Sequence, residues 1–213
     1  MLFDVGPQAR EQAAGGRVAD LRWELPVAVT RSLVGFLSTH VTQAEEDYHW
    51  GELRLHVTSY LCADLPPAEL LTSARAVVLR ASGVLVVRDP VGVHILPGGR
   101  REAGETPAQT VRREVLEETG WAIGPPTLLG VKHFRHRSPK PGGYPYPYPD
   151  FFQVVYAAHA HHLDPNGRER DGYELGAEFH PAVEVQRLPL PPSERVFLTA
   201  AIGRTPSSWR DST

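Results

Sequence analysis

The sequence predicts an α/β fold in which strands and helices share one hydrophobic core. Two runs rich in β-branched residues, 74–80 and 84–89, are separated by Ala-Ser-Gly, which is typical of a β-hairpin. A helix with clear start and stop signals follows at residues 107–119. Two more β-rich runs come after it, 127–136 and 151–160, and the second is apolar on both faces, which favours a central strand.

Length and composition limit the class of protein. The chain has 213 residues, enough for one good-sized core with a small additional subdomain. Its formal net charge of -3 makes a nucleic-acid polymer a poor candidate partner. The single cysteine, Cys62, has no internal disulfide partner, which fits a reducing cytoplasm. We see no secretory leader and no apolar run of membrane-spanning length, so we expect a cytoplasmic protein without membrane association.

The chain divides into an N-terminal extension at 1–68, a main domain at 69–204 and a flexible tail at 205–213. In the extension, residues 30–47 place Leu33, Leu37, Val41 and Ala44 on one face of an expected helix. The alternating run 53–61 predicts a half-buried strand.

The remaining segments are two loops and a closing helix. Residues 137–150 form a proline-stiffened loop, and residues 163–178 form a polar one. The run 193–203 predicts a final helix with Ser193 as its N-cap and Gly203 just past its end.

The sequence contains clear start and stop signals for a helix at 107–119. Thr106 and Gln109 make a capping box, Pro107 suits the first helical position, and Gly120 suits the C-terminal cap. A buried stripe is expected at Ala108, Val111 and Val115.

Three carboxylates crowd another face of this helix. Glu114, Glu117 and Glu118 fall within about 100° of one another, and like charges at this spacing repel. Arg112 and Arg113 are the nearby cations, and both lie upstream. A hard divalent cation held by oxygen ligands would relieve the repulsion. A charged surface helix with local ion pairs is the alternative that helix geometry leaves open.

The turn before the helix strengthens the metal interpretation. Pro97-Gly98-Gly99 allows the backbone to turn tightly and approach a metal or a phosphate. Together with the carboxylates, these parts suit metal-assisted attack of water on a phosphate.

The whole stretch resembles the signature of the Nudix hydrolases. That signature runs glycine, five residues, glutamate, seven residues, and then Arg-Glu-apolar-x-Glu-Glu-x-Gly-apolar. Its fixed positions are filled here by Gly99, Glu105, Arg113, Glu114, Val115, Glu117, Glu118, Gly120 and Trp121. The mild departure is Trp121, where an aliphatic residue is more usual. So many matches at fixed spacing make chance a poor explanation.

Similarity to this family implies an α/β/α sandwich with a mixed sheet, here preceded by the helix–strand extension. It also implies cleavage of a nucleoside diphosphate linked to another group, by water attacking phosphorus in the presence of Mg²⁺, with Mn²⁺ as an alternative ion. The metal ligands implied by position are Glu114, Glu117, Glu118 and the carbonyl of Gly98. Glu117 and Glu118 also count as catalytic, and the resemblance implies that Glu105 and Arg113 lock the loop to the helix.

The general base varies within the family, falling to a glutamate of the signature or to an acid of a later loop. Glu174 and Glu178 lie in the appropriate later region, and Glu178 is the candidate carried forward. A simply exposed loop acid is the alternative for each.

The loop after residue 137 carries the candidate substrate contacts. Proline follows each of Tyr144, Tyr146 and Tyr148, which favours an extended backbone. Tyr146, Tyr148 or Phe151 could stack on a nucleobase, and Arg100 is a further candidate contact. A rigid loop or a dimer contact is the alternative. The secondary markers of the family's substrate subgroups are not met, so a small nucleotide is the only substrate class indicated.

The sequence gives less support to a zinc site and to functions other than hydrolysis. We do not expect zinc at the later histidines, because neither a cysteine nor an acid lies at ligand spacing from His133, His136, His159, His161, His162 and His180. A nucleotide-binding regulator of the same fold without turnover is the main alternative function, and an isoprenoid diphosphate isomerase is disfavoured by the intact signature. Dimerisation is frequent in the family, which favours a homodimer, and the extension could serve as its contact or as a lid.

Overall fold

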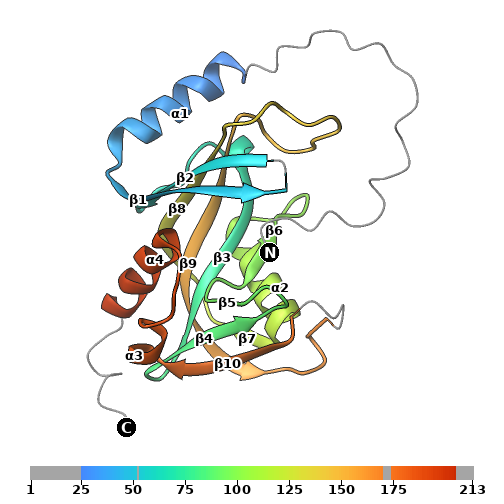
Figure 1. Ribbon diagram of the computed structural model, residues 1–213. Coiled ribbons are helices and arrows are strands. Elements are labelled where there is room, and N and C mark those ends of the chain that lie inside the picture. The colour runs from blue at the N-terminus through green and yellow to red at the C-terminus, as the bar shows by residue number, and fades with distance from the viewer. Residues whose placement is uncertain (1–24, 52, 170–173, 205–213) are drawn as a thin grey trace.

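The computed structural model describes residues 25–51, 53–169 and 174–204 (Figure 1). The predicted tail at 205–213 and the first 24 residues of the predicted extension lie outside these ranges. The helices are α1 (Val27–Thr39), the 3-10 helix η2 (Ala68–Leu70), α2 (Pro107–Thr119), α3 (Ala182–Val185) and α4 (Pro192–Gly203). The strands are β1 (Thr42–Trp50), β2 (Leu53–Leu61), β3 (Leu71–Arg80), β4 (Gly83–Arg88), β5 (Val93–His94), β6 (Gly98–Arg100), β7 (Trp121–Ile123), β8 (Thr127–His136), β9 (Asp150–Leu163) and β10 (Gly176–Pro181).

A mixed sheet runs through the described part of the chain. Its main path is β1-β2-β8-β9-β3-β4-β10, with β5 on β4, β6 on β3 and β7 on β9. β3 and β9 pair in parallel, whereas β8 and β9 pair antiparallel. The predicted hairpin is β3–β4, and the apolar run that we expected to be central is β9, which lies in the middle of this order.

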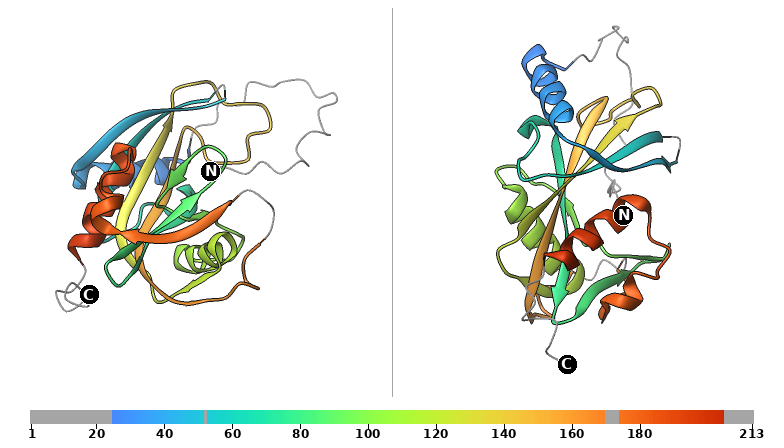
Figure 2. Two further views of the ribbon diagram at one scale, coloured as in Figure 1. Left: turned by 60° about the horizontal axis from the view of Figure 1, so that its bottom comes forward. Right: turned by 90° about the vertical axis from the view of Figure 1, so that its left-hand side faces the viewer.

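Helices cover both faces of the sheet, which confirms the predicted sandwich (Figures 1 and 2). Val111 and Val115 of α2 join one apolar cluster with alternate residues of β3. Phe197 and Leu198 of α4 join a second cluster with the other set of β3 residues. Alternate residues of β3 therefore point to opposite faces of the sheet and contribute to the two apolar clusters.

The N-terminal helix covers the same side of the sheet as α2. Leu33 and Phe36 of α1 belong to the α2-side cluster, and the Phe36 ring meets Phe152 of β9 edge-to-face with centroids 5.6 Å apart. β2 pairs with β8, so the extension continues the sheet of the main domain.

The helix expected at 30–47 is too long. α1 ends at Thr39, and residues 42–50 form β1, which pairs antiparallel with β2. Val41 is 75% exposed, so the apolar stripe does not continue past the helix. Pairing with β2 gives the backbone groups of this segment partners that a longer helix would have to supply itself, and this tertiary contact overrides the helical spacing.

The caps expected for the final helix are also wrong. Pro191 occupies the N-cap position of α4 without a side-chain cap, and Gly203 is the last helical residue. Ser193 is fully buried, and its hydroxyl donates a hydrogen bond to Glu46 of β1. Because that hydroxyl serves a contact between α4 and the extension, it is not available to the helix end.

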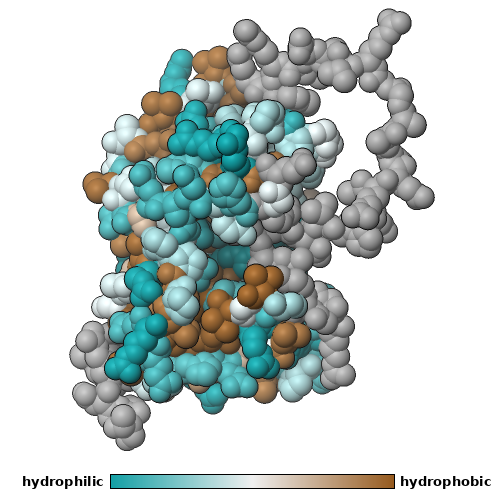
Figure 3. All heavy atoms as spheres, in the orientation of Figure 1, coloured by the Kyte–Doolittle hydropathy of each residue, from teal (hydrophilic) through white to brown (hydrophobic). Residues whose placement is uncertain are grey.

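The molecular surface is mixed in polarity on the face seen in Figure 1. Hydrophilic side chains gather over β1 and β2, and an apolar group shows around β4 and β5 (Figure 3). Val91 and Val93 are exposed in that second region. Within the described residues, none of the helices has the length and apolar character that crossing a bilayer requires.

Candidate active site

The helix that carries the acids is fixed at both ends by its own sequence. Thr106 and Gln109 form the predicted capping box, in which each side chain accepts from the backbone N–H of the other. Gly120 ends the helix in the left-handed conformation at φ 76°, and its N–H donates to the carbonyl of Leu116 over 2.7 Å. The predicted bounds of α2 are therefore confirmed; Val111 and Val115 are buried as expected, and Glu114, Glu117 and Glu118 are partly exposed.

Two glycines bring the preceding turn against the acids. Gly98 has φ 135°, and its N–H donates to Glu118 Oε2 over 2.7 Å. A Cβ on Gly98 would lie 2.7 Å from Arg75 Cα, and a Cβ on Gly99 would lie 2.6 Å from Glu114 Cδ. Real Cβ atoms do not approach other heavy atoms that closely, so a side chain at Gly98 would displace the β3 backbone, whereas one at Gly99 would displace the Glu114 carboxylate.

Arg113 is the electrostatic centre of the cluster. Its Nε and Nη2 donate to the two carboxylate oxygens of Glu105 at 2.7 and 3.0 Å, a bidentate pair. Its Nη1 donates to Glu114 and to Glu117, each over 2.9 Å. Nη2 also donates to the carbonyl of Arg100 over 2.9 Å, which ties the turn to the helix. Charge-assisted, bidentate contacts of this kind define the orientation of the side chains and also stabilise the pair.

The pKa values of the carboxylates are shifted in different directions: that of Glu105 is lowered, and those of Glu114 and Glu118 are raised. The Arg113 hydrogen bonds lower the pKa of Glu105 to about 2. Burial raises the pKa of Glu118 to about 7, against the opposing charge of Arg75 and the Gly98 N–H. Burial also raises the pKa of Glu114, which Arg113 opposes. Strongly perturbed acids that share a partner are typical of functional sites.

Of the two later acids, the structure brings Glu174 into the electrostatic neighbourhood of the cluster. Its charge is among the causes that raise the pKa of Glu118. Glu178 lies on β10 opposite Val86 of β4 and is exposed. Among the contacts of the described residues, none joins Glu178 to the α2 carboxylates.

The tyrosine-containing loop at 137–150 contacts the strand that follows the glycine turn, through Tyr146 and Arg100. The Arg100 guanidinium lies over the Tyr146 ring, 4.7 Å from its centroid. Tyr148 donates its hydroxyl hydrogen to the carbonyl of Ser138 over 3.1 Å. Phe151 is fully buried and stacks on Phe134 with ring centroids 4.9 Å apart. The Tyr148 hydroxyl and the Phe151 ring are therefore both engaged in contacts within the protein. Of the predicted aromatic contacts, Tyr146 is therefore the one that lies beside another predicted substrate contact.

A buried polar row was missed by sequence reasoning. Lys132 of β8, Gln153 of β9 and Ser73 of β3 are direct cross-strand neighbours, and Arg100 of β6 follows opposite Ser73. Gln153 Nε2 donates to Ser73 Oγ over 3.2 Å, which places these two side chains on one face of the sheet; Ser73, Lys132 and Gln153 are buried, whereas Arg100 is exposed. A lysine or glutamine inside an otherwise apolar strand was the signal that could have found it.

Arg75 links this row to the carboxylates. It is 6% exposed, and its Nη1 donates to the carbonyl of Leu96 over 2.8 Å. Its charge acts on the pKa values of Glu118, Glu114 and Lys132 alike. A buried guanidinium thus acts electrostatically on both the acids and Lys132 of the polar row.

Comparison with known proteins decides the family. The family model described as the NUDIX domain matches residues 70–201, more than half of the 213 residues. The chain belongs to the Nudix family. It is therefore assigned to the Nudix hydrolases, which are typically pyrophosphohydrolases. A search of curated proteins gave no match.

Several solved structures resemble this Nudix hydrolase. One is a NUDIX hydrolase from Nitrosomonas europaea, 25% identical, with 55% of this chain and 74% of that one covered and a TM-score of 0.41. A pyrophosphohydrolase from Bacillus subtilis is 17% identical, with 63% and 77% covered and a TM-score of 0.46. A MutT protein from Bacillus halodurans is 21% identical, with 61% and 80% covered and a TM-score of 0.43.

Proposed function

We propose that this Nudix hydrolase cleaves a nucleoside diphosphate linked to another group, by attack of water on phosphorus, with Mg²⁺ or Mn²⁺ bound at the α2 carboxylates. The single observation that carries the proposal is the convergence of Glu114, Glu117 and Glu118 with the Gly98–Gly99 turn. Substrate class, ion and residue roles in the following paragraphs belong to this proposal.

The donor set fits a hard divalent ion. The residues that would hold it are Glu114, Glu117, Glu118 and the carbonyl of Gly98, which are all oxygen donors. Gly99 keeps the flank of Glu114 clear, since any side chain there would collide with the carboxylate. When bound, the ion neutralises negative charge on the diphosphate and lowers the pKa of water.

Arg113 and Glu105 act as positioning residues. Glu105 holds two nitrogens of the guanidinium, and the guanidinium in turn orients Glu114 and Glu117. The carbonyl of Arg100 accepts from the same guanidinium, so the turn and the helix move as one unit. This preorganisation lowers the cost of assembling the ligands when substrate arrives.

We favour Glu174 as the proton acceptor for the attacking water. Its negative charge is among the causes that raise the pKa of Glu118, whereas no such effect of Glu178 is found among the described residues. Glu178 remains the second candidate. If Glu174 is the base, Glu174→Gln removes the acidic limb of the pH–rate profile and Glu178→Gln leaves that limb in place, and the reverse result assigns the role to Glu178.

We propose that substrate meets the protein at Arg100 and Tyr146. Their cation–π contact presents a positive charge and an aromatic ring side by side, next to the turn that carries Gly98 and Gly99. A guanidinium suits a phosphate and a tyrosine ring suits a nucleobase. Tyr148 and Phe151 support the loop through their internal contacts.

The direct test is turnover on a panel of nucleotides with Mg²⁺ or Mn²⁺, followed by release of phosphate or nucleoside monophosphate. Glu118→Gln should reduce the rate by orders of magnitude and keep the circular-dichroism spectrum. The matched control is Glu184→Gln on α3, where the carboxylate is exposed and the rate should not change. Wild-type rates in Glu118→Gln would refute the assignment of the site.

The alternative is a regulator of the same fold that binds nucleotide without turnover. The three α2 carboxylates are retained, which favours the hydrolase. Saturable binding of a nucleotide with no product from any panel member would select the regulator.

The extension and the oligomeric state also remain proposals. β1 ends the strand order of the sheet, and a strand at that place can pair with a second copy. Sedimentation equilibrium would measure the mass, and a monomer at micromolar concentration would refute the expected homodimer.

A further inference from the structure

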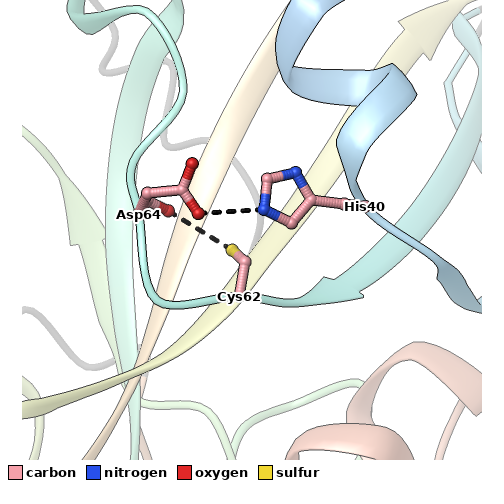
Figure 4. A group of neighbouring side chains, drawn as sticks. All are labelled: His40, Cys62 and Asp64. Carbon is pink, nitrogen blue, oxygen red and sulfur yellow. Dashed lines mark hydrogen bonds and ion pairs between the residues drawn. The ribbon is translucent and has the colours of Figure 1, made fainter.

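The single cysteine lies in a cluster that the proposed hydrolysis does not use (Figure 4). His40 follows α1, and Cys62 and Asp64 follow β2, so two separate elements supply the side chains. One nitrogen, one sulfur and one carboxylate oxygen all lie within 4.8 Å of one another. Sequence reasoning considered other histidines, but His40 and Cys62 are 22 positions apart, and only the fold brings them together.

Hydrogen bonding fixes which ring nitrogen faces the cluster. His40 Nδ1 lies 2.7 Å from the carbonyl of Phe36, and a carbonyl can only accept, so Nδ1 carries the hydrogen. The other nitrogen, Nε2, lies 2.9 Å from Asp64 Oδ1. In a neutral imidazole that Nε2 has a lone pair, which faces an anionic oxygen. The contact therefore requires either a shared hydrogen or a cation between the two atoms.

The geometry points to a cation site, and we propose that His40, Cys62 and Asp64 bind Zn²⁺. Imidazole, thiolate and carboxylate are the three ligand types of protein zinc, and a thiolate disfavours hard ions such as Mg²⁺. A carbonyl that accepts from the far nitrogen of a histidine ligand is the usual second contact at such sites. Three protein ligands leave one tetrahedral position for water.

The distances suit an ion of this size. A tetrahedral Zn²⁺ separates nitrogen and oxygen ligands by about 3.3 Å and sulfur from either by about 3.6 Å. The three atoms already lie within 4.8 Å, and the Asp64 side chain is 65% exposed and can rotate. Cys62 is buried and the His40 side chain is 12% exposed, so the ion would be held from inside and enter past Asp64.

Helix α1 adds to the attraction for a cation. Its C-terminal end carries the negative end of the helix dipole, and its last turn contains no basic side chain. A bound ion would fasten this end of α1 to the turn after β2, and so hold the extension on the sheet. The site is distinct from the α2 carboxylates, which lie on other elements and use oxygen donors.

The experiment uses the full chain, stripped with a chelator and titrated with Co²⁺ in excess Mg²⁺, which saturates the hard-ion site. Co²⁺ reports thiolate ligation by charge-transfer absorption, and the single cysteine assigns that signal to Cys62. We expect one equivalent of thiolate-bound Co²⁺, displaced by Zn²⁺. His40→Ala should weaken binding by about 10–100-fold or more, and Cys62→Ser should abolish the absorption.

Controls separate this site from the rest of the protein. Glu118→Gln and His180→Ala should keep the thiolate signal, and the first shows that it is independent of the hydrolytic site. Because Cys62→Ser alters a buried side chain, Asp64→Asn provides a test at an exposed position, where a loss of affinity is expected in a folded protein. Absence of thiolate absorption in the wild type, or wild-type affinity for Co²⁺ in both Asp64→Asn and His40→Ala, would overturn the proposal.

Discussion

Adding one methyl group at Gly98 or at Gly99 should separate the stability of the fold from the alignment of the carboxylates. At Gly98 the new Cβ lies 2.7 Å from Arg75 Cα, and the backbone has φ 135°. The obstacle is the backbone of β3, which cannot move alone. Overpacking and backbone strain each cost about 1–3 kcal/mol, so Gly98→Ala should lower the free energy of unfolding by about 2–6 kcal/mol.

At Gly99 the obstacle is different in kind. The new Cβ lies 2.6 Å from Glu114 Cδ, the end of a side chain that can rotate away. The stability cost should therefore stay near the lower limit of about 1 kcal/mol. The carboxylate would be displaced by about an ångström, and misplacement of that size at a reacting centre costs about 100-fold in rate.

Urea unfolding and steady-state kinetics on the same three proteins measure this difference. The control is Gly104→Ala, since Gly104 has φ 86° and no heavy atom within 4 Å of its added Cβ. It should lose about 1–2 kcal/mol from backbone strain alone and keep its activity. Full activity in Gly99→Ala would refute the placement of Glu114 at the reacting centre. A Gly98→Ala protein as stable as the control would refute the close contact with β3.

Three further predictions concern the charges and the aromatic loop. Arg113→Ala should reduce kcat by about 10–100-fold because it orients the carboxylates, whereas Arg112→Ala, at the exposed neighbouring position, should change it little in the same assay. Tyr146→Ala should raise KM by about 5–150-fold, equivalent to about 1–3 kcal/mol of stacking, and Tyr146→Phe should not; equal KM values for both variants would exclude stacking. The pKa of Glu105 falls from 4.5 to about 2 on folding, so its contribution to stability is present above pH 4.5 and is lost as the pH falls toward 2. Because this pair is close to the surface, Glu105→Gln should cost about 1–2 kcal/mol at pH 7, and urea titrations should show the difference disappearing near pH 2.

Local chemistry made α2 predictable. Thr106, Pro107 and Gly120 act within a few residues of themselves, so their effect on the helix ends does not depend on the rest of the fold. The spacing that gathers Glu114 and Glu118 on one face is likewise a property of the helix alone. The signature therefore gave both the element and the orientation of its acids.

Three other features depend on contacts between distant parts of the chain and could not be predicted from the sequence. The spacing of Val41 fits a helix, but pairing of β1 with β2 decides its conformation. Ser193 reads as a helix cap, yet Glu46, 147 positions away, takes its hydroxyl hydrogen. Lys132 and Gln153 interrupt two apolar strands, and only the strand register shows that they form one row.

Two cations, the partly exposed Arg113 and the buried Arg75, act on the acidic cluster. Arg113 contacts Glu105, Glu114 and Glu117 directly, which explains why three acids can share one short stretch. None of the contacts found for Glu118 in the described residues is with Arg113: it receives the Gly98 N–H and feels the more remote charge of Arg75. Burial raises its pKa to about 7, and the Arg75 charge and the Gly98 N–H oppose this only in part. For the proposed metal site, Glu118 is therefore the carboxylate expected to gain most from an ion, since Arg113 already orients Glu114 and Glu117.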